Sequence, residues 1–217
     1  MTYTLSDFLL FSERTYQRLF LLHNEALWPV QVFALLVAAG VFVAIATPTQ
    51  LRVRLALGSL ALMWVFVAWV FFWQRYATIN WAAPYVAPIF VVQAVLLFWL
   101  ASDRALRFKC EVSETQRALA VVAGVFAIVG YPAIAAFEGN WKQAEVVGLA
   151  PDPTVLLTMA LLAVVTGRKA AVALVVPVLW VVITALTQWT LGLTQFAILP
   201  IFCVLLLLSR FRWSART

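Results

Sequence analysis

Long runs of apolar residues recur along this chain and constrain its fold more than any other feature. Seven runs are bounded by charged or loop-forming residues: Ala26–Ala46, Leu55–Trp73, Ala82–Ala101, Ala118–Phe137, Pro153–Gly167, Ala170–Trp189 and Thr194–Ser209. Most approach the roughly 20 residues that an α-helix needs to cross a bilayer core of about 30 Å. The alternation of polar and apolar residues typical of a transmembrane β-barrel is absent. The sequence therefore predicts an all-α polytopic membrane protein with seven transmembrane helices.

Composition and charge agree with a membrane protein. Of 217 residues, 65% are hydrophobic and 11% are charged, whereas soluble domains lie near one half apolar and one quarter charged. The formal net charge is +6. Because the arginines cluster at the ends of the apolar runs, we attribute this charge to topology and to contact with anionic lipid rather than to nucleic-acid binding.

The segment before the first run has the pattern of an amphipathic helix. Over Thr4–Leu22 the apolar residues fall mostly on one side and the charged residues on the other, and Ser6 is suited to cap the helix start. Such a helix lies in the membrane interface rather than crossing the bilayer. We therefore expect a single domain in which residues 1–25 form an interfacial helix, 26–209 a seven-span bundle and 210–217 a cytoplasmic tail.

The fifth run, Pro153–Gly167, has only about fifteen residues, so a re-entrant segment is the alternative to a crossing helix. The distribution of Lys and Arg separates the two. If all seven runs cross, the N-terminal side carries four (Arg14, Arg18, Arg75, Lys142) and the opposite side eleven (Arg52, Arg54, Arg104, Arg107, Lys109, Arg117, Arg168, Lys169, Arg210, Arg212, Arg216). Without the fifth crossing the counts become nine and six. Positive charge favours the cytoplasmic side, so we predict seven spans in the inner (plasma) membrane, with the N-terminus outside and the C-terminus inside.

Polar residues within the apolar runs are candidates for function, because an unpaired polar group is costly in hydrocarbon. They gather toward the expected outer side, and we take seven residues as candidate ligand-binding groups: Gln31, Gln93, Tyr131, Glu138, Asp152, Thr154 and Arg75. For several of these residue types a structural role is the alternative to ligand binding. Glutamines also join helices, threonines bond carbonyls of their own helix, and Glu138 is placed to pair with Arg75 or Lys142.

The stretch Leu149–Leu157, LAPDPTVLL, places Asp152 between two prolines. Proline is favoured in the first helical turn, and an aspartate there is a good N-cap. The alternative is that Asp152 forms the floor of a site for a cation or a hydroxyl group. For His23, the only histidine, we expect a solvated ring at the membrane interface rather than a metal ligand.

Motifs of common enzyme and cofactor classes are absent from the sequence. There is no phosphate-binding loop, CxxC, HExxH or GxSxG motif, and the two cysteines, Cys110 and Cys203, give no disulfide framework. We therefore expect no enzymatic activity, no metal and no cofactor.

Three segments, Asn24–Gln31, Ile79–Phe98 and Gly130–Thr158, resemble an uncharacterised bacterial family of small polytopic integral membrane proteins, classed as a domain of unknown function. The resemblance covers nearly the whole chain. Its most specific part is a Tyr-Pro element followed by V-A-P-C-P-T-T, here Tyr131-Pro132 and Leu149–Val155. Asp152 stands where the family pattern has cysteine and Val155 where it has threonine, so any soft-metal or redox chemistry of that cysteine would be missing here. The resemblance implies the architecture and no activity.

Two hypotheses of function follow. The chain binds or transports a small solute or ion through an outward-facing polar cavity, or it is a non-catalytic structural or accessory subunit of a larger membrane complex. The expected partners are the lipid bilayer, a small solute or ion, and other membrane subunits or copies of this chain. A transporter requires a hydrated cavity lined by the candidate side chains, whereas in a scaffold these side chains bond to one another.

Overall fold

The computed structural model describes residues 11–103, 113–137 and 140–214. These residues are helical, with no β-strand among them and one isolated bridge between Val147 and Ala150. Each of the seven expected runs coincides with a helical stretch: α2 (Val30–Ala46); α3 (Gln50–Phe66) with η2 (Val67–Arg75) and η3 (Tyr76–Thr78); α4 (Ala83–Ser102); α5 (Glu114–Val125) with η4 (Phe126–Gly130) and α6 (Tyr131–Phe137); α7 (Pro151–Val164); α8 (Arg168–Val172) with α9 (Val175–Thr190); and η6 (Thr194–Ala197) with α10 (Ile198–Ser214). The all-α class is confirmed.

Several of these helices have the length and apolar character of membrane spans. Four stretches qualify singly, Gln50–Thr78, Ala83–Ser102, Glu114–Phe137 and Arg168–Thr190. A fifth is the pair α1 (Glu13–Leu27) and α2, if the two count as one bent span, whereas α7 and Thr194–Arg210 are shorter apolar helices. The described residues are thus compatible with a membrane protein.

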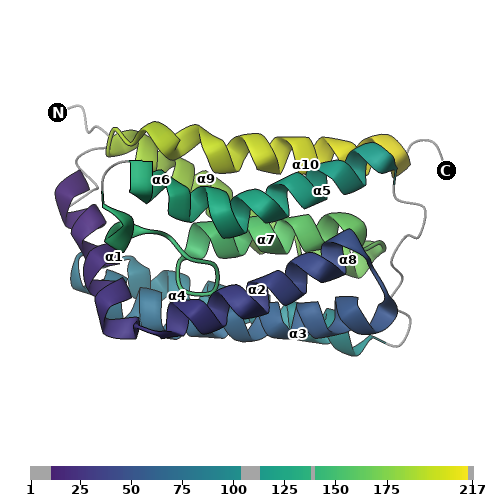
Figure 1. The fold of residues 1–217 in the computed structure, drawn as a ribbon, viewed down its shortest axis with the longest axis horizontal. Coiled ribbons are helices and arrows are strands. Elements are labelled where there is room, and N and C mark those ends of the chain that lie inside the picture. The colour runs from purple at the N-terminus through teal and green to yellow at the C-terminus, as the bar shows by residue number, and fades with distance from the viewer. Residues whose placement is uncertain (1–10, 104–112, 138–139, 215–217) are drawn as a thin grey trace.

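Helix α1 lies across one end of the bundle and is bent by 94° from α2 (Figure 1). The bend falls where the sequence requires it, because the residue before a proline disfavours the helical conformation, and α1 ends just before Trp28 and Pro29. The expected bounds were wrong: α1 begins at Glu13 with Ser12 as its cap and runs to Leu27. Ser6, the expected cap, lies outside the described residues.

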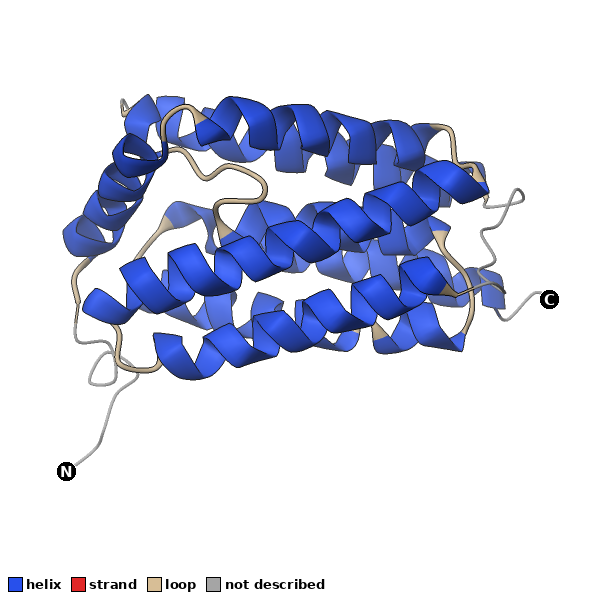
Figure 2. Ribbon diagram, turned by 90° about the horizontal axis from the view of Figure 1, so that it is seen from below, coloured by secondary structure: helices blue, strands red, loops and turns tan. Residues whose placement is uncertain are grey.

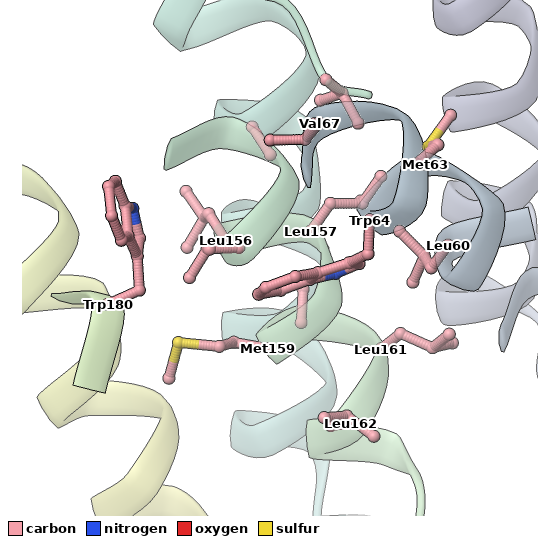
Figure 3. Packing of buried hydrophobic residues seen from close by; sticks show 14 of the residues in the cluster. Leu60, Met63, Trp64, Val67, Leu156, Leu157, Met159, Leu161, Leu162 and Trp180 are labelled. Carbon is pink, nitrogen blue, oxygen red and sulfur yellow. The ribbon is translucent and has the colours of Figure 1, made fainter. Parts of the chain in front are cut away.

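Helix α7 forms the centre of the fold (Figure 1). It contacts α2, α3, α5, α9 and α10, and the surrounding helices contact one another in the closed order α2, α3, α4, α9, α10, α5 and back to α2. Every residue of α7 is buried. Figure 3 shows its leucines, Leu156, Leu157, Leu161 and Leu162, among side chains of the neighbouring helices. The fifth run is mostly apolar on every side because α7 is enclosed by protein rather than exposed on one face.

Polar side chains from other helices donate hydrogen bonds to the carbonyl oxygens at the C-terminal end of α7. The Arg210 guanidinium donates to the carbonyl oxygens of Leu162 at 2.7 Å and Val165 at 2.8 Å, and the Gln116 amide donates to the Ala163 oxygen at 2.7 Å. The last carbonyls of a helix lack partners within it and carry the negative end of the helix dipole. A cation and an amide donor at this end explain how a helix terminus can be buried.

The N-terminal end of α7 is covered by the chain segment that leads into it. Residues 145–150 are buried, and this loop folds between the helices rather than over the end of the bundle (Figure 2). Gly148 has a φ of +82°, a left-handed conformation that favours glycine. Its backbone N–H donates to the Thr154 hydroxyl at 2.7 Å, and that hydroxyl donates to the Ala150 oxygen.

Candidate functional site

Asp152 is completely enclosed, and three donors from one face of α9 reach its carboxylate. The Trp180 indole N–H lies 2.7 Å from Oδ1, and the Thr184 hydroxyl and the Gln188 amide lie 2.9 Å and 2.7 Å from Oδ2. The prediction of Asp152 as helix cap was wrong, because Ala150 occupies the cap position and makes no side-chain bond. Asp152 lies one residue inside α7, from where its side chain reaches α9 instead of its own backbone.

The spacing of these donors is visible in the sequence. Trp180, Thr184 and Gln188 are four residues apart in succession, which places them on one face of a helix. Thr187 belongs to the other face and donates to the Ile183 oxygen of its own helix. The sequence thus showed a polar stripe on this helix, but it did not show which group the stripe binds.

Gln93 and Thr154 also have structural partners and line none of the cavities described below. The Gln93 amide, fully buried, donates to the Ala173 oxygen at 2.9 Å and so joins α4 to the C-terminal end of α8. Thr154 bonds the loop before its own helix, and Thr158 one turn on accepts from the Trp64 indole at 2.9 Å. For these residues the structural alternatives account for the contacts.

A groove of about 550 Å³ lies between the α1–α2 corner and the segment around η5 (Trp141–Gln143). Its walls are mostly apolar and come from Trp28, Val32, Leu35, Trp141, Ala144 and Val146; the polar lining residues are Asn24, Glu25, Gln31 and Lys142. The Lys142 ammonium and the Glu25 carboxylate form an ion pair of 3.0 Å with both side chains about half exposed. Asn24, Trp28 and Gln31, which are four and three residues apart in the sequence, therefore lie together in this groove.

Of the candidate ligand-binding residues that the structure describes, Gln31 lines this groove. Its side-chain N–H donates to the Asn24 backbone oxygen at 2.7 Å, while the Asn24 amide donates to the backbone oxygens of Lys142 and Ala144. The bond to the Asn24 oxygen orients the Gln31 amide. Its Oε1 atom is buried and accepts no hydrogen bond from the described part of the chain. It is therefore an acceptor without a donor among the described residues, in a side chain whose residue lines the groove.

A second, smaller cavity of about 30 Å³ contains Tyr131. Its polar lining residues are Tyr16, Gln17, Tyr131, Gln143, Glu145 and Gln195; Phe20, Ile134, Ala135 and Leu193 complete it. Glu145 is 6% exposed and Tyr131 is 4% exposed. Glu145 was not among the candidate residues, because it lies in the small-residue and apolar stretch Ala144–Ala150.

The groove and the cavity share one wall. In the segment from Lys142 to Val146, residues 142, 144 and 146 line the groove, whereas residues 143 and 145 line the cavity. From Ala144, where η5 has ended, the chain is not helical, and Ala144, Glu145 and Val146 alternate between the two sides as in an extended chain. A period of two beside an otherwise helical pattern was the signal in the sequence that could have identified Glu145.

The remaining predictions concern Arg75, Glu138 and His23. Arg75 is partly buried at the end of η2, where its backbone oxygen accepts from the Thr78 hydroxyl, and it lines neither the groove nor the cavity. Glu138 lies outside the described residues, and the partner of Lys142 is Glu25. The expected solvated ring of His23 was wrong, since the ring is 1% exposed and bonds the Leu149 oxygen at 3.1 Å. The reason is the long loop before α7, which covers this face of α1.

The arrangement defines a helical bundle with an enclosed central helix, an apolar groove and a small polar cavity. The chain belongs to the family described as "Family of unknown function (DUF6064)", which matches residues 13–216. Comparisons with curated proteins and with solved structures gave no match. The expected membership of an uncharacterised family is thus confirmed, while the motif around Asp152 stays a prediction.

Proposed function

We propose that this chain is a non-enzymatic integral protein of the inner membrane that crosses the bilayer seven times and binds a lipid-like amphiphile in the groove at Gln31. In this proposal α1 lies in the outer interface and α10 ends in the cytoplasm. Two observations support the topology. The helical stretches run back and forth so that α1 and the end of α10 lie at opposite ends of the bundle (Figure 1), and Lys and Arg concentrate on the α10 side.

The chemistry of the groove supports an amphiphile over a polar solute. Its volume of about 550 Å³ falls in the range of roughly 300–1,000 Å³ typical of small-molecule sites. Most of its lining is apolar, with Trp28 and Trp141 at 67% and 69% exposure, so an apolar chain gains by entering it. In the proposed topology the groove meets the outer interface, where a lipid has its polar head beside its chains.

The observation that carries the proposal is the Oε1 atom of Gln31, which is buried and has no donor among the described residues. A buried acceptor without a donor costs about 1–3 kcal/mol, and a ligand N–H or O–H removes this cost. The ion pair of Lys142 and Glu25 adds both signs of charge to the groove. The ligand class we propose therefore has an apolar chain and a polar head that carries a hydrogen-bond donor.

Two lipids with identical acyl chains test this proposal, because the ammonium head of phosphatidylethanolamine donates hydrogen bonds and that of phosphatidylcholine does not. Native mass spectrometry of the purified chain should show retention of phosphatidylethanolamine about threefold to tenfold above phosphatidylcholine, the value of one hydrogen bond. Gln31→Leu should abolish this preference. Gln74→Leu makes the same change at an exposed glutamine and should retain it.

A second variant keeps the test valid if Gln31→Leu does not fold. Val32 lies in the groove and is 49% exposed, so Val32→Trp should fill the groove, leave the Gln31 hydrogen bond intact and lower the binding of both lipids. Equal retention of the two lipids by the unaltered chain would contradict the proposal, as would an unchanged preference in Gln31→Leu.

The alternative function, an accessory subunit of a membrane complex, is favoured by a different observation. Gln93, Asp152, Thr154 and Thr158 bond within the chain, and a second groove of about 540 Å³ between η2 and α4 is apolar throughout. A stable complex of defined composition after mild detergent extraction, lost when Val92→Trp fills that second groove, would support this alternative over lipid binding.

A further inference from the structure

We propose that the small cavity between α1, α6 and the loop before α7 binds one small monovalent cation. Six of its ten lining residues have oxygen-bearing side chains: Tyr16, Gln17, Tyr131, Gln143, Glu145 and Gln195. The described residues that line it include no lysine and no arginine. Hard cations bind such oxygen ligands, whereas an anion would meet only a carboxylate of its own sign.

The size of the cavity limits its occupant to a single small species. About 30 Å³ corresponds to one or two positions of water size. An amino acid, a sugar or an organic cation such as choline does not fit this volume. Alkali ions and water are the candidates that do.

The charge of Glu145 favours the ion over water. Glu145 is 6% exposed and also interacts with other groups of the chain, and a carboxylate attracts a cation strongly at short distance. A carboxylate offers about four acceptor positions, so Glu145 can bind a cation and keep its contacts within the protein. A single carboxylate balances a single positive charge, and no group of three acidic, histidine or cysteine residues suited to a divalent metal occurs among the described residues.

Gln195 provides a second, independent observation. Its Oε1 atom is buried, lies in a residue of the cavity lining and accepts no hydrogen bond from the described chain. An amide oxygen in this position is suited to coordinate a cation. Gln195 precedes α10 in the 3₁₀ turn η6, and Glu145 lies in the loop before α7, so an ion shared by the two would connect these segments.

Thermal unfolding of the purified full chain tests the proposal. We would titrate it with NaCl, KCl and LiCl against choline chloride at constant total chloride. Tm should rise with one or more of the alkali ions and saturate with concentration, as expected for a ligand that binds the folded chain only. Choline should have no such effect. Binding of radioactive sodium, if Na⁺ is the preferred ion, should give about one ion per chain.

Variants distinguish coordination from a general salt effect. Glu145→Gln keeps the side-chain shape and should lower the cation affinity, read from the concentration dependence of the Tm rise, at least tenfold. Gln195→Leu should lower this affinity to a lesser degree. Glu114→Gln removes an exposed carboxylate at the start of α5 and should leave the rise unchanged. Gln31→Leu should also leave it unchanged, which separates this cavity from the lipid groove.

Three results would overturn the proposal. They are a Tm that follows choline and the alkali ions alike, a response only to divalent ions, and an equal loss of the response in Glu145→Gln and Glu114→Gln. If Glu145→Gln does not fold, Gln195→Leu and Tyr131→Phe test whether the cavity binds a cation, because each removes one cavity oxygen without a change of charge. An unchanged cation affinity in both would show that the cavity holds water only.

Discussion

The indole N–H of Trp180 donates to the Asp152 carboxylate over 2.7 Å and ties the first turn of α7 to the middle of α9. Thr184 and Gln188 complete the contact from the same face of α9. The carboxylate is thus a junction between the central helix and one helix of the surrounding ring. Asp152 is therefore first of all a structural residue, and the contact predicts how much its replacement lowers the stability of the fold.

Replacement of Asp152 should destabilise the fold far more than the loss of a helix cap, which costs about 1 kcal/mol. Asp152→Ala leaves three buried donors without an acceptor and should lower the free energy of unfolding by about 3 kcal/mol or more. Asp152→Asn, which keeps one acceptor oxygen, should cost less. Unfolding by denaturant in detergent measures both, with Thr187→Ala on the exposed face of α9 as a control that should change little. A loss of only about 1 kcal/mol in Asp152→Ala would show that the contact contributes little to stability.

Arg210 should be required for the buried C-terminal end of α7. Arg210→Met removes the donors to Leu162 and Val165 and should lower the unfolding free energy by about 2 kcal/mol, since each is a charge-assisted bond to a helix terminus. Arg210→Lys should retain only part of the stability that Arg210 provides, because an ammonium lacks the planar fork of the guanidinium. The exposed Arg52, which bonds Thr47, supplies the matched control Arg52→Met. Equal stability of the two methionine variants would refute this role.

The stability of the chain should fall as the pH falls from neutrality, because of His23. Its Nε2 donates to the Leu149 oxygen, and burial, with a smaller effect of Arg75, lowers the pKa of the ring from 6.5 to about 4. The unfolded chain therefore binds a proton at a higher pH than the folded chain does. The contribution of neutral His23 is complete above pH 6.5 and is lost progressively between pH 6.5 and 4.

Unfolding curves at several pH values check this prediction. The loss attributable to His23 is about 3 kcal/mol at most, since one pKa unit corresponds to about 1.4 kcal/mol. His23→Gln, which keeps a donor for Leu149, should be less stable at neutral pH and should show a much flatter dependence between pH 6.5 and 4. The same slope in both proteins would place the responsible titration elsewhere.

Labelling of single cysteines should establish the orientation. In a chain with Cys110 and Cys203 replaced, a cysteine at Thr78 or Lys142 should react with an impermeant maleimide added to intact cells, and one at Arg168 should react only after permeabilisation. All three positions are exposed in the fold. The opposite pattern would reverse the orientation, and labelling of all three from outside would show that the stretch containing α7 does not cross.

The sequence alone predicted the helices, and it also predicted the faces of some of them. Apolar runs of spanning length predicted the class, and the four-residue spacing of Trp180, Thr184 and Gln188 contains the polar face of α9. The break at Pro29 was missed, because the expected run Ala26–Ala46 passed through it. These features are local, since each depends on residues within a few turns of one another. The seven predicted runs agree with the helical stretches for this reason, although their crossing of a membrane stays a proposal.

Only the tertiary structure decided what the polar groups contact. Asp152 binds α9 instead of capping its own helix, His23 is buried under the loop before α7, and residues 142–146 separate the groove from the cavity. Each contact joins residues 28 or more positions apart, so no local pattern contains it. The fifth run showed that α7 is short and apolar, but its central position follows from the closed order of the helices around it, because close packing of whole helices determines which one is enclosed.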